Sequence, residues 1–185
     1  MAQAAFPLLE TERLVLREHR LLDQEAVFSV FADEAVTRHY LVAPFTEMAQ
    51  AQRVVQRRID RFYAGKGIRW AITRRGEDVL LGSCGFSDWQ RRQGTAELGY
   101  ELARPYWNQG IMTEALQACL AYAFTVRGLL RIEAQILPEN EASRRVLQKL
   151  EFQWAGLRER GGYLNGRYYD LELFVLEIDR RTRKT

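Results

Sequence analysis

The feature that most constrains the fold is a strand that leads, through a short loop, into a helix. Residues 95–102 (TAELGYEL) alternate in the manner of a strand, and WNQGIMTEAL places Gly110 just before a helix expected over 113–127. The apolar face of that helix is Leu116, Cys119, Leu120, Ala123 and Phe124. The first turn of a helix carries backbone N–H groups without partners and the positive end of the dipole. We therefore expect this junction to bind an anion, such as a phosphate.

Periodicity along the rest of the chain predicts a mixed α/β sheet in a single domain. No repeat, linker or low-complexity tract interrupts residues 1–185, and the charged end 179–185 is expected to fray. The expected strands are 12–18, 68–74, 79–88, 95–102, 131–137, 153–160 and 168–178. The expected helices are 22–32, 46–65, 113–127 and one that begins after Asn140.

Composition describes a globular domain and excludes several classes of protein. Of the 185 residues, 47% are hydrophobic and 28% are charged, which is too apolar for a disordered chain. A net charge of +3 suits an anionic ligand but makes nucleic-acid binding an unfavoured interpretation. No signal peptide or membrane span is expected, so we expect a cytoplasmic location. Cys84 and Cys119 lie far apart without a histidine cluster, which predicts neither a metal site nor a disulfide framework.

Four stretches together carry a resemblance to a known family. The stretches are TERLVLRE, ELGYEL with YWNQGIMTEAL, PENEASRRVLQKLEF, and GYLNGRYYDLELFVLEI. In the order and spacing of these stretches the chain resembles the GNAT-fold N-acetyltransferases along nearly its whole length, especially the branch of the ribosomal-protein alanine N-acetyltransferases, RimJ and RimL. The resemblance implies a mixed, mostly antiparallel sheet of six to seven strands with helices on both faces, splayed between the strands at 95–102 and 131–137.

The resemblance also implies acetyl-CoA as cosubstrate, without a metal. Its pyrophosphate would bind backbone N–H groups of the loop Gln109, Gly110, Ile111, Met112, Thr113 and Glu114. The family usually has alanine or glycine where Met112 stands. The pantetheine arm would lie in the splay near Asn140, and N–H groups near Leu102 and Ala103 would stabilise the oxyanion. From the residues alone, Asn140 is equally a helix N-cap, and the two roles are compatible.

Acetyl transfer to an amine needs a base for the amine, stabilisation of the oxyanion and a proton for the leaving thiolate. Because the thioester is already activated, we expect direct attack in a ternary complex. The candidate base is Glu97, which shares one strand face with Gly99 and Glu101; the alternative is that these glutamates face solvent or pair with arginine. By the resemblance, Ser143 is the candidate acid; the alternative is a serine that only satisfies the first turn of a helix.

The acceptor is expected to be a primary amine, on a protein N-terminus, ribosomal or other, or on a small molecule. Its site should lie between residues 38–45 and the late strands. Aromatic residues in a mixed sheet are usually part of a core, so each candidate taken singly is weak evidence. The chain is expected to be a monomer or a homodimer. The candidates to line the acceptor site are Tyr40, Trp89, Tyr163 and Tyr169.

Two other functions remain open at this point. Gly162 stands where related enzymes can carry a carboxylate, and with Met112 it would suit an acyl-CoA-binding module with weak or lost catalysis. An RNA-associated protein would use the arginines that gather on the helix 46–65, although a solvated helix face explains them more simply. These arginines are Arg53, Arg57, Arg58 and Arg61.

One residue is expected in an unusual backbone conformation. Glu151 ends the helix in KLEF, where the family typically has glycine. Helices often end with one residue in the left-handed conformation, which glycine adopts without strain. We therefore expect Glu151 to be strained.

Overall fold

The computed structural model describes residues 5–90 and 92–178, so the end 179–185 lies outside the described part of the chain. The helices are α1 (Gln24–Ala32), α2 (Glu34–Thr37), α3 (Met48–Tyr63), α4 (Ile111–Thr125) and α5 (Glu141–Lys149), with single 3₁₀ turns η1 (Leu21–Asp23) and η2 (Arg104–Tyr106). The strands are β1 (Leu9–Glu10), β2 (Leu14–Arg17), β3 (Ile68–Arg74), β4 (Gly82–Gln90), β5 (Thr95–Leu102), β6 (Arg131–Ile136), β7 (Gln153–Leu164) and β8 (Arg167–Glu177).

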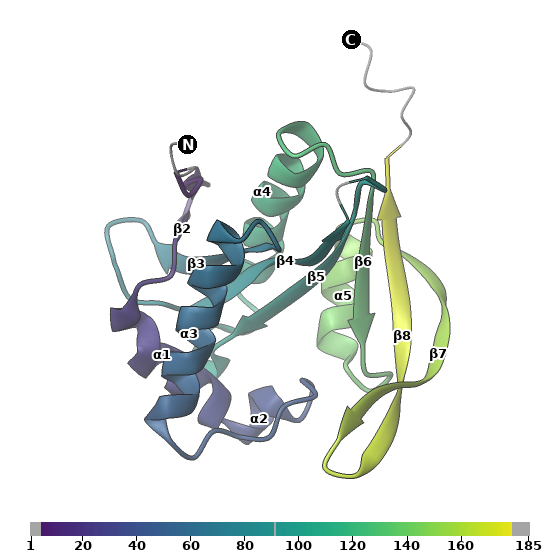
Figure 1. The fold of residues 1–185 in the computed structure, drawn as a ribbon, viewed down its shortest axis with the longest axis horizontal. Coiled ribbons are helices and arrows are strands. Elements are labelled where there is room, and N and C mark those ends of the chain that lie inside the picture. The colour runs from purple at the N-terminus through teal and green to yellow at the C-terminus, as the bar shows by residue number, and fades with distance from the viewer. Residues whose placement is uncertain (1–4, 91, 179–185) are drawn as a thin grey trace.

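The strands form one mixed sheet in the order β1-β2-β3-β4-β5-β6-β8-β7 (Figure 1). The β5–β6 pair is parallel and the other neighbours are antiparallel. The described residues thus contain eight strands, where six to seven were expected. The additional strand is β1, whose two residues are too few for an alternating pattern to be visible in the sequence.

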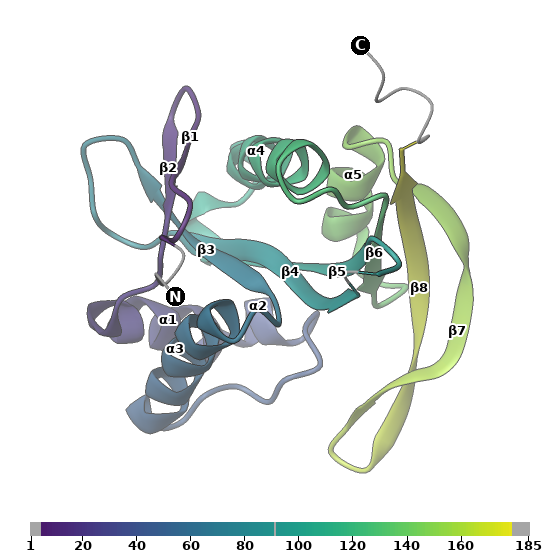
Figure 2. The same ribbon diagram turned by 45° about the horizontal axis from the view of Figure 1, so that its top comes forward.

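Helices cover both faces of the sheet, as expected. Figure 2 shows α4 and α5 on one face and α1, α2 and α3 on the other. The core under α4 and α5 is apolar and contains the fully buried Trp70, whose indole N–H donates to the carbonyl of Pro7 (2.9 Å). The smaller core under α1 and α3 includes Val27 and Val55. The α3 side of the sheet also holds buried charges, so the two faces differ in chemistry.

The splay between β5 and β6 is confirmed. Their parallel pairing runs from Thr95↔Arg131 to Leu98↔Ala134. Beyond that point β5 continues to pair with β4 as far as Leu102, while β6 continues to pair with β8 as far as Ile136. In Figure 1 the two strands lie side by side near the top and diverge downward. The sheet therefore has an opening along the last residues of β5.

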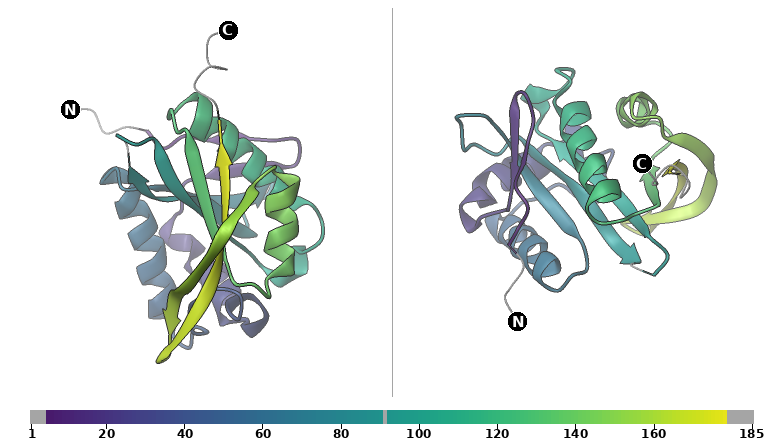
Figure 3. Two further views of the ribbon diagram at one scale, coloured as in Figure 1. Left: turned by 90° about the vertical axis from the view of Figure 1, so that its right-hand side faces the viewer. Right: turned by 90° about the horizontal axis from the view of Figure 1, so that it is seen from above.

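The last two strands, β7 and β8, form a hairpin that reaches residues 38–45, where Gly162 lies beside Leu41. Figure 3 shows β7 crossing over β8, with pairing irregularities after Trp154 and Arg158. Gly162 of β7 is buried, and a Cβ there would collide with the side chain of Leu41. Gly162 therefore leaves room for the end of the Leu41 side chain, which a larger residue at this position would displace.

The conformation expected of Glu151 is confirmed, with φ of +65°. The N–H of Phe152 donates to the carbonyl of Leu147 and the N–H of Glu151 to that of Gln148, both at 3.0 Å. This pair of hydrogen bonds is the Schellman ending of a helix, which requires a left-handed residue at the position that Glu151 occupies.

Candidate active site

The N-terminus of α4 presents backbone N–H groups in a geometry suited to an anion. Gly110 is the N-cap with φ of +76°, and Asn108 has φ of +58°. Left-handed residues before a helix turn neighbouring N–H groups in one direction, and glycine permits this without a steric cost. No side chain caps this end of α4. Binding of the pyrophosphate here remains a prediction, and the geometry is compatible with it.

Glu114 fixes the first turn of α4 and offers no donor to a ligand. Its carboxylate accepts from the hydroxyl of Thr11 (2.6 Å) and from the backbone N–H and the Nε of Arg13 (2.9 and 2.6 Å). Burial would raise the pKa of Glu114, but these hydrogen bonds outweigh it and lower that pKa. Its own N–H donates to the carbonyl of Gly110 (3.0 Å). The donors left for a phosphate are therefore those of residues 111–113.

Two further side chains shape this loop. Met112 is buried in the core, so its size does not obstruct the ligand side of the turn. The Arg13 guanidinium contacts the carbonyl of Gln109 (Nη1, 3.2 Å), and its Nη2 would lie 3.5 Å from a Cβ on Gly110. Arg13 thus places a cation beside the junction. The sequence analysis missed this residue, because nothing local to TERLVLRE indicates which helix it reaches.

The opening beside β5 contains unpaired backbone groups. The N–H of Ala103 donates to the carbonyl of Leu81 (2.8 Å), which removes Ala103 as an oxyanion donor. Alternate residues of an antiparallel strand direct their N–H groups to the same side, so those of Tyr100 and Leu102 point away from β4, into the opening. The carbonyl of Leu102 accepts from the indole N–H of Trp107 (2.7 Å), whereas its N–H remains for a ligand.

Asn140 and Ser143 begin α5 at the same edge of the sheet. The side-chain oxygen of Asn140 accepts from the N–H of Ser143 (3.1 Å), so Asn140 is an N-cap, and its amide NH₂ remains able to donate. The hydroxyl of Tyr100 lies 3.4 Å from the carbonyl oxygen of Ser143. Burial raises the pKa of Tyr100, which keeps its phenol protonated. Tyr100 is a further polar group at this site that the sequence analysis did not name. Strand alternation places its side chain on the other face of β5 from that of Glu97.

Glu97 lies on the α3 side of β5, opposite Ser87 of β4 and Glu133 of β6. Burial raises the pKa of Glu97 and the nearby carboxylates of Asp88 and Glu133 raise it further, while Arg158 opposes them. A half-buried carboxylate with a raised pKa accepts a proton closer to neutral pH than an ordinary glutamate does. These properties suit a base, and the role remains a prediction.

Glu101 is not an exposed residue but the centre of a buried ion cluster. It pairs with Arg58 (2.8 Å) and with Arg69, and it accepts from the hydroxyls of Ser83 and Tyr40, the latter at 3.3 Å. Burial would raise the pKa of Glu101, but the two arginines outweigh burial and hold it below its ordinary value. The interpretation that a glutamate of this strand pairs with arginine is therefore correct for Glu101. The solvated-face interpretation is wrong for Arg58, whose side chain is 10% exposed.

A cavity of about 630 Å³ lies on this face of the sheet, between α3, residues 38–45 and the strands β3 and β4. Part of its wall is apolar, formed by Phe31, Val42, Phe45 and Val54. Among the residues described in the structure, no acidic side chain lines it. The wall also carries five arginines, Arg53, Arg57, Arg58, Arg61 and Arg69.

The four aromatic candidates separate into different environments. Tyr40 lines the cavity and accepts from Arg69 (3.1 Å). Tyr169 lies opposite Gly162 and hence on the inner face of the hairpin, whereas Tyr163 is 60% exposed on the outer face. Trp89 packs against the core under α4, with the guanidinium of Arg127 4.4 Å from its ring. The acceptor role expected for Trp89 and Tyr163 is not supported by these positions.

The described residues give no indication of a metal centre or of a membrane span. In residues 5–90 and 92–178, no group of three or more His, Cys, Asp or Glu side chains is placed to hold a metal ion. No helix in the same ranges has the length and apolarity that crossing a bilayer requires.

Comparison with known proteins identifies the family. The profile described as "Acetyltransferase (GNAT) domain" matches residues 13–153. The chain belongs to the GNAT acetyltransferases. The protein described as "Uncharacterized N-acetyltransferase YoaA", from Bacillus subtilis (strain 168), is 37% identical over 171 residues, which are 92% of this chain and 97% of that protein. Because this relative is named an N-acetyltransferase and is similar along nearly its whole length, the comparison supports the same enzyme class for this chain.

Two solved GNAT structures extend the comparison to the fold. An acetyltransferase from Bacillus anthracis has a TM-score of 0.82 with 26% identity, covering 92% of this chain and 98% of that one. RimL, a ribosomal L7/L12 alpha-N-protein acetyltransferase in complex with coenzyme A, has a TM-score of 0.82 with 25% identity, covering 94% and 99%. The GNAT fold and the likeness to the RimL group expected from the sequence are therefore confirmed.

In this GNAT acetyltransferase, the predicted base and acid lie on opposite faces of the sheet. Glu97 is on the α3 side with the cavity, and Ser143 is on the side of α4 and α5. The opening beside Tyr100 and Leu102 joins the two sides. A thioester placed in the opening would meet an amine from one face and release a thiol toward the other.

Proposed function

We propose that this protein transfers the acetyl group of acetyl-CoA to the α-amine of a protein N-terminus. The observation that carries the proposal is the opening between β5 and β6. The N-terminus of α4 lies on one face of the sheet, and the arginine-lined cavity lies under α3 on the other face. A pantetheine arm in this opening would bring the thioester between a phosphate site and an acceptor site. The RimL structure, described with coenzyme A bound, supports the choice of donor and acceptor.

The donor would be held mainly by backbone groups. Its pyrophosphate would lie at the first turn of α4, on the N–H groups of residues 111–113 and beside the cation of Arg13. Asn140 would donate its amide NH₂ to the pantetheine, while its oxygen continues to cap α5. Such a site recognises coenzyme A by the shape and charge of its phosphates and by strand-like pairing with the arm.

The reaction would proceed by direct attack. Glu97 takes a proton from the amine, the amine nitrogen forms a bond to the acetyl carbon, and the carbon–sulfur bond breaks. The N–H of Leu102 stabilises the oxyanion, and Ser143 assists protonation of the leaving thiolate. Neither cysteine is suited to carry the acetyl group, because both are buried, with 3.3 Å between Sγ atoms, and burial raises the pKa of Cys119.

The charge of the cavity favours an α-amine over a lysine. Cations near an ammonium group lower its pKa, which helps deprotonation but opposes binding of the charged form. An α-amine has a pKa of about 7.7–8.0 and lysine about 10.4, so near pH 7.5 roughly a third of the α-amine is neutral against roughly one lysine in a thousand. A wall with five arginines therefore discriminates against lysine side chains.

The alternative of an acyl-CoA-binding module with lost catalysis rested on Gly162 and Met112. Each residue has a packing reason: Gly162 makes room for Leu41, and Met112 fills the core under α4. Neither substitution therefore needs a loss of catalysis to explain it.

The test is release of coenzyme A thiol with a panel of amines. The panel contains peptides with a free α-amine, the same peptides blocked at the N-terminus but carrying lysine, and small amines. We expect turnover with the free peptides and, by mass spectrometry, one acetyl group on the N-terminal residue. Acetylation of lysine alone would refute the choice of acceptor. Tight binding of acetyl-CoA without turnover of any amine would favour the binding module.

A further inference from the structure

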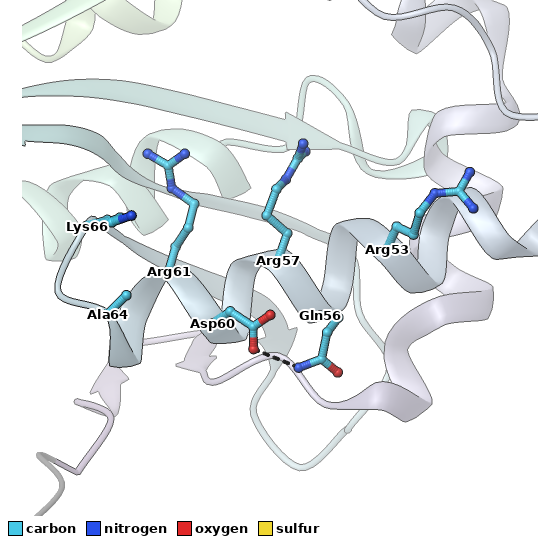
Figure 4. Close-up of a pocket in the computed structure, with 7 residues that line it drawn as sticks. All are labelled: Arg53, Gln56, Arg57, Asp60, Arg61, Ala64 and Lys66. Carbon is cyan, nitrogen blue, oxygen red and sulfur yellow. Dashed lines mark hydrogen bonds between the residues drawn. The ribbon is translucent and has the colours of Figure 1, made fainter.

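Three arginines of α3 form a row along one side of the helix. Arg53, Arg57 and Arg61 follow at four-residue intervals, and Figure 4 shows their side chains on the same side of α3. Gln56 and Asp60 lie on another side of the helix, where Gln56 Nε2 donates to Asp60 Oδ1 (2.8 Å). We call these three cations the arginine row; in the described structure they form no ion pair with Asp60, which lines a surface pocket beside them.

The arginine row lines the cavity, where its charge is poorly neutralised. Arg61 has Asp88 at 3.5 Å, between side chains that are 40% and 69% exposed. Within the part of the chain that the structure describes, Arg53 and Arg57 have no ion pair with an acid. The two inner arginines of the cavity already share the carboxylate of Glu101. The mouth of the cavity therefore carries at least two cations available to a ligand.

Such a row is unfavourable for the isolated protein. Like charges four residues apart on a helix repel each other, and in the described part of the chain neither Arg53 nor Arg57 forms an ion pair, although Asp60 lines the same surface pocket. An anionic ligand in the cavity would remove this repulsion. The cavity shares Tyr40, Val42 and Phe45 with the region expected to border the acceptor, while its strand residues come from β3 and β4 and not from the late strands. We take the acceptor as the carrier of that negative charge.

The spacing of the arginine row indicates what kind of acceptor fits. Four residues of helix span about 6 Å. In an extended peptide, side chains on one face recur every two residues, at about 6.6–7 Å. Arginines at positions i and i+4 of α3 therefore match carboxylates at alternate positions of an extended peptide. Adjacent carboxylates of such a peptide point to opposite faces, so only one of them would meet the row.

We infer that the acceptor is the N-terminus of an extended acidic segment, whose carboxylates at alternate positions pair with Arg57 and Arg53. The amine lies at the Ser87 end of the cavity, across from Glu97, and the segment runs along α3 toward its N-terminus. This inference rests on the proposed function and names the substrate class of the same site. It gives the helix arginines a role that a solvated face would not require.

The test compares three peptides of equal length with a free α-amine. One carries acidic residues at alternate positions, one carries the same number at adjacent positions, and one carries glutamine in their place. The wild-type protein should have the highest kcat/KM for the alternating peptide, and that preference should weaken as salt is added. Equal kcat/KM for the alternating and adjacent peptides would overturn the inferred spacing, and equal values for all three would overturn the inference.

The matched variants are Arg53→Gln/Arg57→Gln and, as control, Arg145→Gln/Lys149→Gln. The control removes two exposed cations, four residues apart, from α5 on the other face of the sheet. The first variant should raise the KM of the alternating peptide roughly 3- to 30-fold, because exposed pairs are individually weak. Its acetyl-CoA affinity should match the wild type, and its kcat/KM should fall less with the glutamine peptide than with the alternating peptide. The control variant should keep the full preference.

The outcomes separate this inference from the proposed function. If no peptide is acetylated, the proposed function fails and this inference fails with it. If all peptides are acetylated and Arg53→Gln/Arg57→Gln behaves as the wild type, only the inference fails. It also fails if that variant loses salt-dependent binding of a single-stranded RNA oligonucleotide while its peptide kinetics are unchanged, since the row would then be an RNA site.

Discussion

Replacing Glu151 with glycine should stabilise this acetyltransferase. The two hydrogen bonds at the end of α5, from Phe152 to Leu147 and from Glu151 to Gln148, hold Glu151 at φ of +65°. A residue with a Cβ is strained in this conformation, because the Cβ comes too close to the following carbonyl oxygen. Glycine makes the same two backbone hydrogen bonds without that clash, so the native ending of the helix is kept.

The expected gain follows from three terms. Relief of the left-handed strain is worth about 1–2 kcal/mol. This gain is reduced by about 0.5–1 kcal/mol, because glycine has greater conformational freedom in the unfolded chain and loses it on folding. Loss of a carboxylate at the negative end of the helix dipole adds a few tenths of a kcal/mol. The central values of these terms give a net stabilisation of about 1 kcal/mol, which for a chain of this length raises Tm by about 2–4 °C.

Thermal unfolding and urea unfolding of matched variants measure this gain. Glu151→Ala removes the charge but keeps the Cβ, so it should gain only the few tenths of a kcal/mol that come from the helix dipole. Gly65→Ala makes the reverse change at φ of +66° after α3 and should cost a comparable amount. If Glu151→Ala stabilises as much as Glu151→Gly, the charge and not the backbone is responsible. A lowered Tm for Glu151→Gly would refute the reasoning altogether.

Three further predictions concern the reaction. Gly110→Asp should abolish acetyl-CoA binding by repelling the pyrophosphate, whereas the control Gly76→Asp, with φ of +78° in an open turn, should bind acetyl-CoA normally. Calorimetry on both folded variants measures the affinity, and a near-native affinity of Gly110→Asp would place the anion elsewhere. Glu97→Gln should lower kcat/KM about 10²–10⁴-fold near neutral pH and recover partly above about pH 9, where the amine is already neutral. Because burial raises the pKa of Glu97, the wild type should lose activity on acidification earlier than an ordinary glutamate would dictate; full activity of Glu97→Gln at all pH values would refute the base. Ser143→Ala should show a smaller defect that shrinks with thioesters of more acidic thiols, and a defect independent of the thiol would remove Ser143 from this role.

The sequence predicted the elements whose signals are local. Residues 95–102 were assigned to a strand with the bounds of β5, and α4 starts two residues before the expected 113. Asn140 and Glu151 were placed at helix ends because caps are encoded within a few residues. The strand expected at 79–88 begins at Gly82 instead, because the residues before it belong to the loop from β3.

The sequence could not predict contacts that join distant elements. The position of Arg58 depends on how α3 packs on the sheet. Its pairing with Glu101, which also pairs with Arg69, depends on the register of β5 and β3 against β4. A helix pattern shows only that Arg58 is polar and next to Arg57. The surroundings of Trp89 were equally invisible in the sequence, since only the assembled structure shows that it packs against the larger core beside Arg127.

The buried ion cluster and the reaction depend on the same register of β5. Alternation puts Glu97 and Glu101 on the cavity face and Tyr100 on the face of α5. A slip by one residue would exchange these faces and drive the Glu101 carboxylate into the apolar core, away from Arg58 and Arg69. Leaving that carboxylate unpaired would cost several kcal/mol, as would leaving the two arginines without it. The cluster therefore opposes the slip that would move Glu97, the proposed base, away from the proposed acceptor side and turn the free N–H groups of β5 away from the opening.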